Sequence, residues 1–257
     1  MSRVEKLCIL SFMSQGHDFH LYTYGKVNGI PNGVKVFDGE EILNSNHIFL
    51  NSDKKTYSGF SNLFRYKLLR DKGGIWVDLD VVCLRPFDFT EGTIIAQEVD
   101  EDQSVIVTTC VIEAPPNSGL MQRCYAEAEK IDRGNQKFGE IGPYFFSKFV
   151  KQHASQVSLR PPSVFCPVPY NRWSDLISSS PEHQSFVDNS IGSETLSVHL
   201  WNEMWRSAKI DKNGSFSSTS FFERACAKFG VPRADRLGSK VFRFWRSQRE
   251  RRRAKSE

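Results

Sequence analysis

Apolar positions at helical spacing alternate along the chain with short runs of β-prone residues. Near the N-terminus the apolar residues recur every three or four positions, at Val4, Leu7, Cys8 and Phe12. This spacing predicts an amphipathic helix that ends near Gly16. The segments "DFHLYTYG" and "GVKVFD" that follow are rich in aromatic and β-branched residues, and each predicts a short strand.

The clearest helix prediction covers residues 61–72, "SNLFRYKLLRDK", where Phe64 and Leu68 share one face with Phe60. A Gly-Gly pair directly after this segment is expected to end the helix. The next run, "GIWVDLDVVCL", is mostly apolar before its first Asp. We therefore expect a strand there that is covered on both faces.

The second half of the chain continues the alternation. It predicts a strand at 104–112, helices near 118–133 and 143–152, and short strands near 164–168 and 196–201. Asp38 with Glu41, and Ser220 with Glu223, have the spacing of a capping box, and the second pair would begin a helix that ends at Gly230. Strands that alternate with helices indicate an α/β sandwich around a mostly parallel sheet.

Length and composition fit a soluble globular protein. The chain has 257 residues, of which 39% are hydrophobic and 25% charged. These proportions exclude wholesale disorder, coiled coils and small disulfide scaffolds. We expect one domain over residues 1–232 and a basic helix or tail over 233–257.

The positive charge is concentrated at the C-terminus. Residues 240–257 hold eight of the 34 Lys and Arg and two of the 30 Asp and Glu, so this segment carries +6 and the remainder −2. A nearly neutral domain argues against nucleic acid as a partner. Phe242, Phe244 and Trp245 interleave with arginines in the tail. This pattern fits an anionic membrane surface and equally a solvated end.

The cysteines and the apolar runs indicate a cytoplasmic protein. Six cysteines form no Cys-x-x-Cys pair, which argues against zinc ligation and favours buried, reduced thiols. No apolar run approaches the ~20 residues that span a bilayer. The segment "LCILSFM" lacks a small-residue cleavage site, so we interpret it as helix and not as a signal peptide.

Asp78 and Asp80 are the first candidates for chemistry. At strand spacing their carboxylates would point to the same side, and two like charges so close favour a cation between them. A hard divalent ion, Mn²⁺ or Mg²⁺, suits oxygen ligands of this kind. For an isolated Asp-x-Asp the more frequent interpretation is a solvated acidic turn. The sequence around the pair decides between the two.

The stretch "FSNLFRYKLLRDKGGIWVDLDVVCLRPFD" resembles the signature of glycosyltransferases with a DXD-containing sugar-binding region. These are glycosyltransferase family 32 and its relatives, including capsular-polysaccharide and α-1,4-galactosyltransferase-like enzymes. The segments "LCILSFMSQGHDFHLYTYG", "GPYFFSKFV" and "SVHLWNEMWR" match in the same order, so the resemblance spans roughly residues 4–230.

The resemblance implies an α/β, GT-A-like (Rossmann-like) fold and a metal-dependent, retaining transfer. A hexose would move from a nucleotide sugar, with a UDP-sugar favoured, to a polysaccharide or glycolipid precursor. The acceptor would be a glycan or a lipid-linked molecule, and the enzyme would lie in the cytoplasm or at the inner face of the membrane. Relatives usually begin with a strand just before the first helix. Because this chain begins with the helix, we expect either a late start or a fold without that strand.

By the same resemblance, Asp80 binds the ion directly, and Asp78 reaches the ion and the ribose or sugar hydroxyls. His199 matches a family histidine near the metal and the diphosphate, and imidazole suits Mn²⁺ better than Mg²⁺. Taken alone, His199 would more often be a core histidine on a strand. The neighbouring "LWNEMW" favours the metal site.

The resemblance assigns further residues to the donor. These are Ser61, Asn62, Arg65 and Trp201 for the nucleotide sugar, and Glu98 facing the sugar. Asn62 stands where many relatives carry Asp, and the less favoured alternative for Arg65 is a surface residue of an amphipathic helix. Trp201 and Trp205 fit either stacking on the donor or burial in the core. Gly142 with Pro143 fits the diphosphate side or simply a helix start.

Two other functions stay open from the sequence. "VDLDVV" also resembles the start of haloacid-dehalogenase-like phosphatases, in which the first Asp is the nucleophile. That family has a later Gly-Asp-x-x-x-Asp pattern, which is missing after residue 80. The second alternative is a degenerate transferase that acts as a binding protein.

Overall fold

The computed structural model describes residues 1–89 and 92–233. The central element is a four-stranded sheet in the order β3-β6-β5-β7. Its strands are β3 (Gly74–Val77), β5 (Thr93–Val99), β6 (Val105–Ala114) and β7 (Val157–Arg160). Two smaller sheets flank it: β1 (His20–Thr23) with β2 (Lys35–Asp38), and β4 (Val81–Cys83) with β8 (Ser197–His199).

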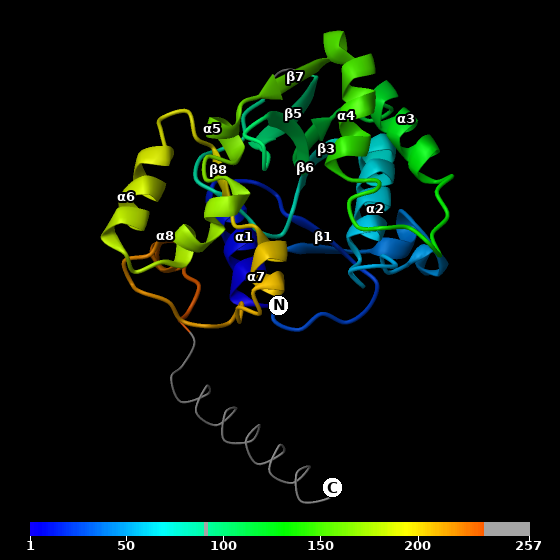
Figure 1. The fold of residues 1–257 in the computed structure, drawn as a ribbon. Helices are drawn as coiled ribbons and strands as arrows, with labels where there is room; N and C mark the ends of the chain where they lie inside the picture. The colour runs from blue at the N-terminus through cyan, green and yellow to red at the C-terminus, as the bar shows by residue number, and fades with distance from the viewer. Residues whose placement is uncertain (90–91, 234–257) are drawn as a thin grey trace, which may run out of the picture.

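Helices cover both faces of the central sheet (Figure 1). The helices on one face are α2 (Ser58–Lys72), α3 (Gly119–Ala128) and α4 (Pro143–Gln152). The other half contains α1 (Arg3–Ser14), α5 (Pro162–Phe165), α6 (Pro181–Ser190), α7 (Asn202–Ser207) and α8 (Phe221–Lys228). Short 3₁₀ turns occur at Gly39–Glu41, Ser45–His47, Ala154–Gln156 and Tyr170–Ile177.

Alternation along the central strands divides the core into two clusters. Ile94 and Val111 point into a cluster with α1, β4, β8 and α8, whereas Ile95 and Ile112 point into a cluster with α2, α3 and α4. Successive strand residues face opposite sides of a sheet, so one apolar run can serve both clusters. The sandwich that the sequence predicts is therefore confirmed, and so is the α/β fold class.

Strand pairing is more mixed than a mostly parallel sheet. The pairs β1–β2 and β5–β7 are parallel, and the pairs β3–β6, β5–β6 and β4–β8 are antiparallel. The short connection between β5 and β6 forces an antiparallel hairpin, because a parallel crossover needs a dozen or more residues. No periodicity within a strand reports the direction of its partner.

Most elements lie where the hydrophobic pattern places them. The first helix, the helix after residue 58, the helix at 143–152, and the strands in "HLYT", "KVFD" and "SVH" are confirmed. The Ser220 hydroxyl accepts the amide of Glu223, and α8 ends two residues before Gly230. At Asp38 the carboxylate accepts the amide of Glu40, so the cap is present but begins only a 3₁₀ turn.

Three predictions about elements are wrong. The run "GIWVDLDVVCL" is two strands in two sheets, because the chain turns at Leu79–Asp80 between β3 and β4. The strand predicted near 164–168 is absent from these described residues, because Pro162–Phe165 form a short helix, and the strand of this region is β7. Helix α3 ends at Ala128 and not near 133.

None of the helices within residues 1–89 and 92–233 has the length and apolar character needed to cross a bilayer. The predicted basic tail, with Phe242, Phe244 and Trp245, lies outside the described residues.

Candidate active site

A cavity of about 1520 Å³ opens between α2, β3 and the start of α7. Its wall includes all eight residues that the sequence assigned to the site: Ser61, Asn62, Arg65, Asp78, Asp80, Glu98, His199 and Trp201. Cavities at the ends of strands in open α/β sheets are the usual place for ligands. The fold therefore brings together residues that are up to 140 positions apart in the chain.

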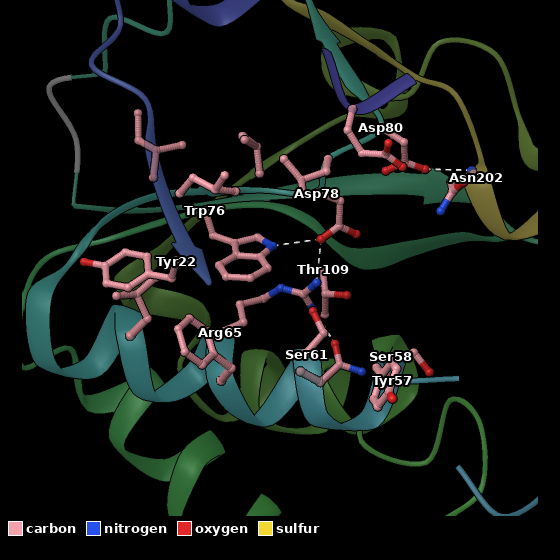
Figure 2. A pocket seen from close by; sticks show the side chains of 18 of the residues that line it. Tyr22, Tyr57, Ser58, Ser61, Arg65, Trp76, Asp78, Asp80, Thr109 and Asn202 are labelled. Atoms are coloured by element: carbon pink, nitrogen blue, oxygen red, sulfur yellow. Dashed lines mark hydrogen bonds and ion pairs between the residues drawn. The ribbon is translucent and has the colours of Figure 1, made fainter. Parts of the chain in front are cut away.

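Asp80 and His199 form a buried pair in this wall. His199 ends β8 and pairs with Val81, which places its Nε2 at 3.2 Å from Asp80 Oδ2. The same carboxylate oxygen accepts the backbone amide of Asn202 at 2.7 Å (Figure 2). Both side chains are buried.

The two groups stabilise each other's charge. Burial disfavours the ionised carboxyl of Asp80, but the His199 imidazole and the Asn202 amide outweigh it and lower the pKa of Asp80. Burial likewise disfavours the charged ring, but the carboxylate of Asp80 outweighs it and raises the pKa of His199 to about 10. The pair is therefore ionic at neutral pH.

Asp78 lies nearer the opening and is held by two side chains (Figure 2). Its Oδ1 accepts Arg65 Nη2 at 2.5 Å and the indole Nε1 of Trp76 at 2.8 Å. Arg65 is buried, stacks on the Trp76 ring at 4.7 Å, and also donates to Asn62 Oδ1. Its Nε is buried without a hydrogen-bond partner in the part of the chain that the structure describes. Arg65 is thus part of the cavity wall and not a surface cation.

The carboxylates of Asp78 and Asp80 converge by a turn and not by strand spacing. Strand β3 ends at Val77, and the Val81 amide donates to the carbonyl of Asp78 at 3.1 Å. One ligand atom from each of Asp78, Asp80 and His199 lies within 4.8 Å of the others. Two carboxylates and an imidazole suit Mn²⁺, and the set fits a divalent ion.

Glu98 lies within β5. Its carboxyl lines the cavity, and burial raises its pKa. Its Oε2 is buried and has no partner among the described residues. The side chain is therefore held in the wall with one oxygen available to a ligand.

The two tryptophans have different environments. Trp201 lines the cavity, but its Nε1 donates to the Val168 carbonyl at 2.9 Å and its ring lies 4.1 Å from that of His199. Trp201 thus supports the histidine and is only 8% exposed. Trp205 is fully buried in the core, which excludes it as a stacking platform.

Ser61, Gly142 and Pro143 also line the cavity, and Gly142 lies next to Asn62. Gly142 caps α4, and a Cβ there would lie 3.1 Å from the Gly139 carbonyl. The helix-start interpretation of Gly142–Pro143 is correct, and both residues also face the cavity. Thr109 of β6 lines the same space (Figure 2).

Sequence reasoning missed two residues of the site. Trp76 binds Asp78 and stacks on Arg65, as described above. Asn202 lines the cavity with its Oδ1 buried and unpartnered among the described residues. Both lie within segments quoted for the resemblance, "GIWVDLD" and "HLWNEMW", so their proximity to the candidate metal ligands was the available signal.

Comparisons with known proteins agree with this geometry. Residues 2–100 match the family model described as "Glycosyltransferase sugar-binding region containing DXD motif". Residues 135–229 match "Alpha 1,4-glycosyltransferase conserved region". The first match contains Asp78 and Asp80, and the second contains His199 and Trp201.

Among solved structures, one titled "PaToxG Glycosyltransferase" is similar with a TM-score of 0.44 and 15% sequence identity. The similarity covers 60% of this chain and 65% of that chain, so this chain spans less than two thirds of its length. Comparison with curated protein sequences found no match.

The two family matches support a glycosyltransferase and give no support to the phosphatase alternative. They cover the two halves of one cavity in chain order, and each describes glycosyltransferases. The chain is thus similar to two glycosyltransferase families over residues 2–100 and 135–229, and these matches support a glycosyltransferase.

Proposed function

We propose that the protein is a metal-dependent, retaining hexosyltransferase that uses a nucleotide sugar, with a UDP-sugar favoured. One observation carries the proposal: Asp78, Asp80 and His199 bring their ligand atoms within 4.8 Å of one another in the wall of a cavity of about 1520 Å³. A cavity of this size is large enough for a nucleotide sugar and part of an acceptor.

Asp80 and His199 would hold the ion directly, and Asp78 would complete the set from the other side. When bound, Mn²⁺ or Mg²⁺ supplies Lewis-acid stabilisation of negative charge on the departing diphosphate. The buried Asn202 Oδ1 would add a fourth ligand atom, an oxygen of the kind that hard cations prefer. Mn²⁺ is the favoured ion because of the imidazole.

The donor would lie along α2. Arg65 is fixed by Asn62, Asp78 and Trp76, and its Nε is free of partners among the described residues. A guanidinium held in this way can donate to a diphosphate or a sugar hydroxyl without further loss of side-chain entropy. Ser61 and Asn62 would bond hydroxyl groups of the donor from the same wall.

Glu98 would face the transferred sugar. Burial raises the pKa of its carboxyl, and its Oε2, which has no partner among the described residues, can accept a hydrogen bond from a sugar hydroxyl. We assign no nucleophile, and retention through front-face transfer rests on the family resemblance. Trp201 keeps the ring of His199 in place through their contact.

The acceptor would be a polysaccharide or glycolipid precursor, and the enzyme would work in the cytoplasm. The basic tail would bring it to the inner face of the membrane, where a lipid-linked acceptor resides. Sedimentation with anionic vesicles tests this step. Binding that survives neutralisation of Arg249, Arg251, Arg252 and Arg253 would contradict it.

Calorimetric titration with UDP- and GDP-sugars, with and without Mn²⁺, tests the central proposal. We expect metal-dependent binding of a UDP-sugar that is lost in Asp80→Asn. The control is Asp71→Asn on α2, a carboxylate that pairs with Lys67 and Arg70 and does not line the cavity. Binding that ignores Mn²⁺, or no donor binding by the folded chain, would contradict the proposal. An inverted anomeric configuration of the product, measured by NMR, would contradict retention alone.

A further inference from the structure

Two cysteines meet directly behind the candidate active site. Cys110 lies in β6 and Cys166 follows α5, yet their sulfur atoms are 3.5 Å apart. Each residue is 1% exposed. Their separation of 56 positions explains why the spacing of cysteines in the sequence argued against zinc.

His199 is the third member of this cluster. One ligand atom from each of Cys110, Cys166 and His199 lies within 4.8 Å of the others. The Nε2 of His199 is engaged with Asp80, whereas its Nδ1 is buried and has no hydrogen-bond partner within residues 1–89 and 92–233. The histidine is 8% exposed, so an unpartnered nitrogen lies next to two thiols away from solvent.

We propose that Cys110 Sγ, Cys166 Sγ and His199 Nδ1 form a binding site for a soft divalent cation of the Zn²⁺ class. In a tetrahedral zinc site with Zn–S bonds of ≈ 2.3 Å, two sulfur ligands lie about 3.8 Å apart. The observed sulfur–sulfur distance of 3.5 Å is close to this value. Three protein ligands leave one coordination position open.

Asp80 supports the same assignment. A histidine that ligates a metal through one nitrogen usually gives its other N–H to a carboxylate, which fixes the tautomer. Asp80 Oδ2 at 3.2 Å from Nε2 stands in that position. Two thiolates also neutralise a divalent cation, which suits a site without solvent. Binding releases one proton from each thiol and the proton on Nδ1.

The two metal sites share His199. Thiolates and imidazole select Zn²⁺, whereas the carboxylates of Asp78 and Asp80 suit Mn²⁺. When His199 ligates zinc and its Nε2 is paired with Asp80, the imidazole is not available to the site formed by Asp78 and Asp80. This consequence rests on the proposed function: Zn²⁺ is then an inhibitor that weakens Mn²⁺-dependent donor binding.

A titration of the reduced full-length chain with Cd²⁺ tests the site, because cadmium thiolates absorb in the ultraviolet. We expect one Cd²⁺ per chain with a thiolate band, and at least tenfold weaker binding in Cys110→Ser and in Cys166→Ser. The matched control is Cys124→Ser, a buried thiol in the other core cluster. A band that survives both Cys110→Ser and Cys166→Ser, or no band from the folded chain, overturns the proposal.

X-ray absorption of the Zn²⁺-loaded, unsubstituted chain avoids any effect of substitution on folding. Sulfur neighbours at about 2.3 Å are expected, and a shell of only nitrogen and oxygen overturns the site. Asp78→Asn separates the two proposals, since it should retain the Cd²⁺ band and lose Mn²⁺-dependent donor binding. A thiolate band without donor binding in the unsubstituted chain contradicts the proposed function alone. Donor binding without the band contradicts the thiol site alone.

Discussion

Arg65 on α2 and Asp78 after β3 form an ion pair at 2.5 Å in which the arginine is the buried partner. The Arg65 side chain is 4% exposed and that of Asp78 is 29% exposed. A buried guanidinium needs a nearby negative charge, because its own solvation is lost. The pair therefore fixes a cation in the cavity wall and joins the helix to the DXD turn.

Arg65→Ala should lower both stability and donor binding. Removal of one partner of a buried pair costs about 3 kcal/mol, since the other charge is left uncompensated. We expect this loss in denaturant unfolding and at least tenfold weaker UDP-sugar binding by calorimetry. Arg70→Ala is the control, because Arg70 is partly exposed and pairs with Asp71 at the surface, a contribution below about 1 kcal/mol. Equal losses in the two variants would contradict the assignment.

Asn202→Ala should weaken Mn²⁺ binding and preserve the fold. The substitution removes the unpartnered Oδ1 but keeps the backbone amide that donates to Asp80 at 2.7 Å. We expect a several-fold higher Mn²⁺ dissociation constant in an electron-paramagnetic-resonance titration. Asn46→Ala, an exposed residue in a 3₁₀ turn, serves as the control. Unchanged Mn²⁺ affinity in Asn202→Ala would show that its side chain does not reach the ion.

Glu223→Gln should remove an acid-sensitive part of the stability. Arg3 on α1 donates from both terminal nitrogens to the Glu223 carboxylate on α8, each at 2.9 Å. Burial opposes ionisation, but the bonds from Arg3 and from the Phe216 amide outweigh it and lower the pKa of Glu223 below its usual 4.5. The folded chain thus holds this proton less tightly than the unfolded chain.

The stabilisation is fully present above pH 4.5 and is lost as the pH falls through the lowered pKa. We expect Glu223→Gln to cost about 3 kcal/mol at neutral pH and to flatten the stability curve on the acid side. Denaturant unfolding measured from acid to neutral pH checks both the loss of stability and the flatter pH dependence. Glu203→Gln breaks a surface pair with Arg206 and should cost less than about 1 kcal/mol. If the stability of Glu223→Gln falls with decreasing pH as steeply as that of the unsubstituted chain, the Arg3–Glu223 pair is not the source of the acid sensitivity.

Gly73→Ala should destabilise the end of α2. Gly73 has φ +67°, and a Cβ there would lie 2.5 Å from the backbone nitrogen of Pro116. Positive φ alone costs a non-glycine residue of order 1–3 kcal/mol. Gly74→Ala isolates that part, because Gly74 has φ +94° and nothing within 4 Å of its Cβ position. Thermal unfolding should show the larger loss of stability for Gly73→Ala. Equal losses in the two variants would exclude the contact with Pro116 as a cause of destabilisation.

The sequence by itself determined the local elements and the chemistry of the cavity wall. The periods of α1, α2 and α4 report which face of a segment is buried, and this depends only on residues a few positions apart. Asp78, Asp80, Arg65 and His199 were found because the motif places fixed residue types at short spacing. Their roles toward donor and metal stay predictions.

Only the tertiary structure decided which distant groups meet. The Asp80–His199 pair depends on β4 pairing with β8, and the approach of Cys166 to Cys110 depends on the seating of α5 against β5. The break between β3 and β4 has the same origin, because a two-sided apolar run does not show where the chain leaves one sheet for another. Periodicity is a property of a segment, whereas contact is a property of two surfaces, and their fit arises only when the whole chain has packed.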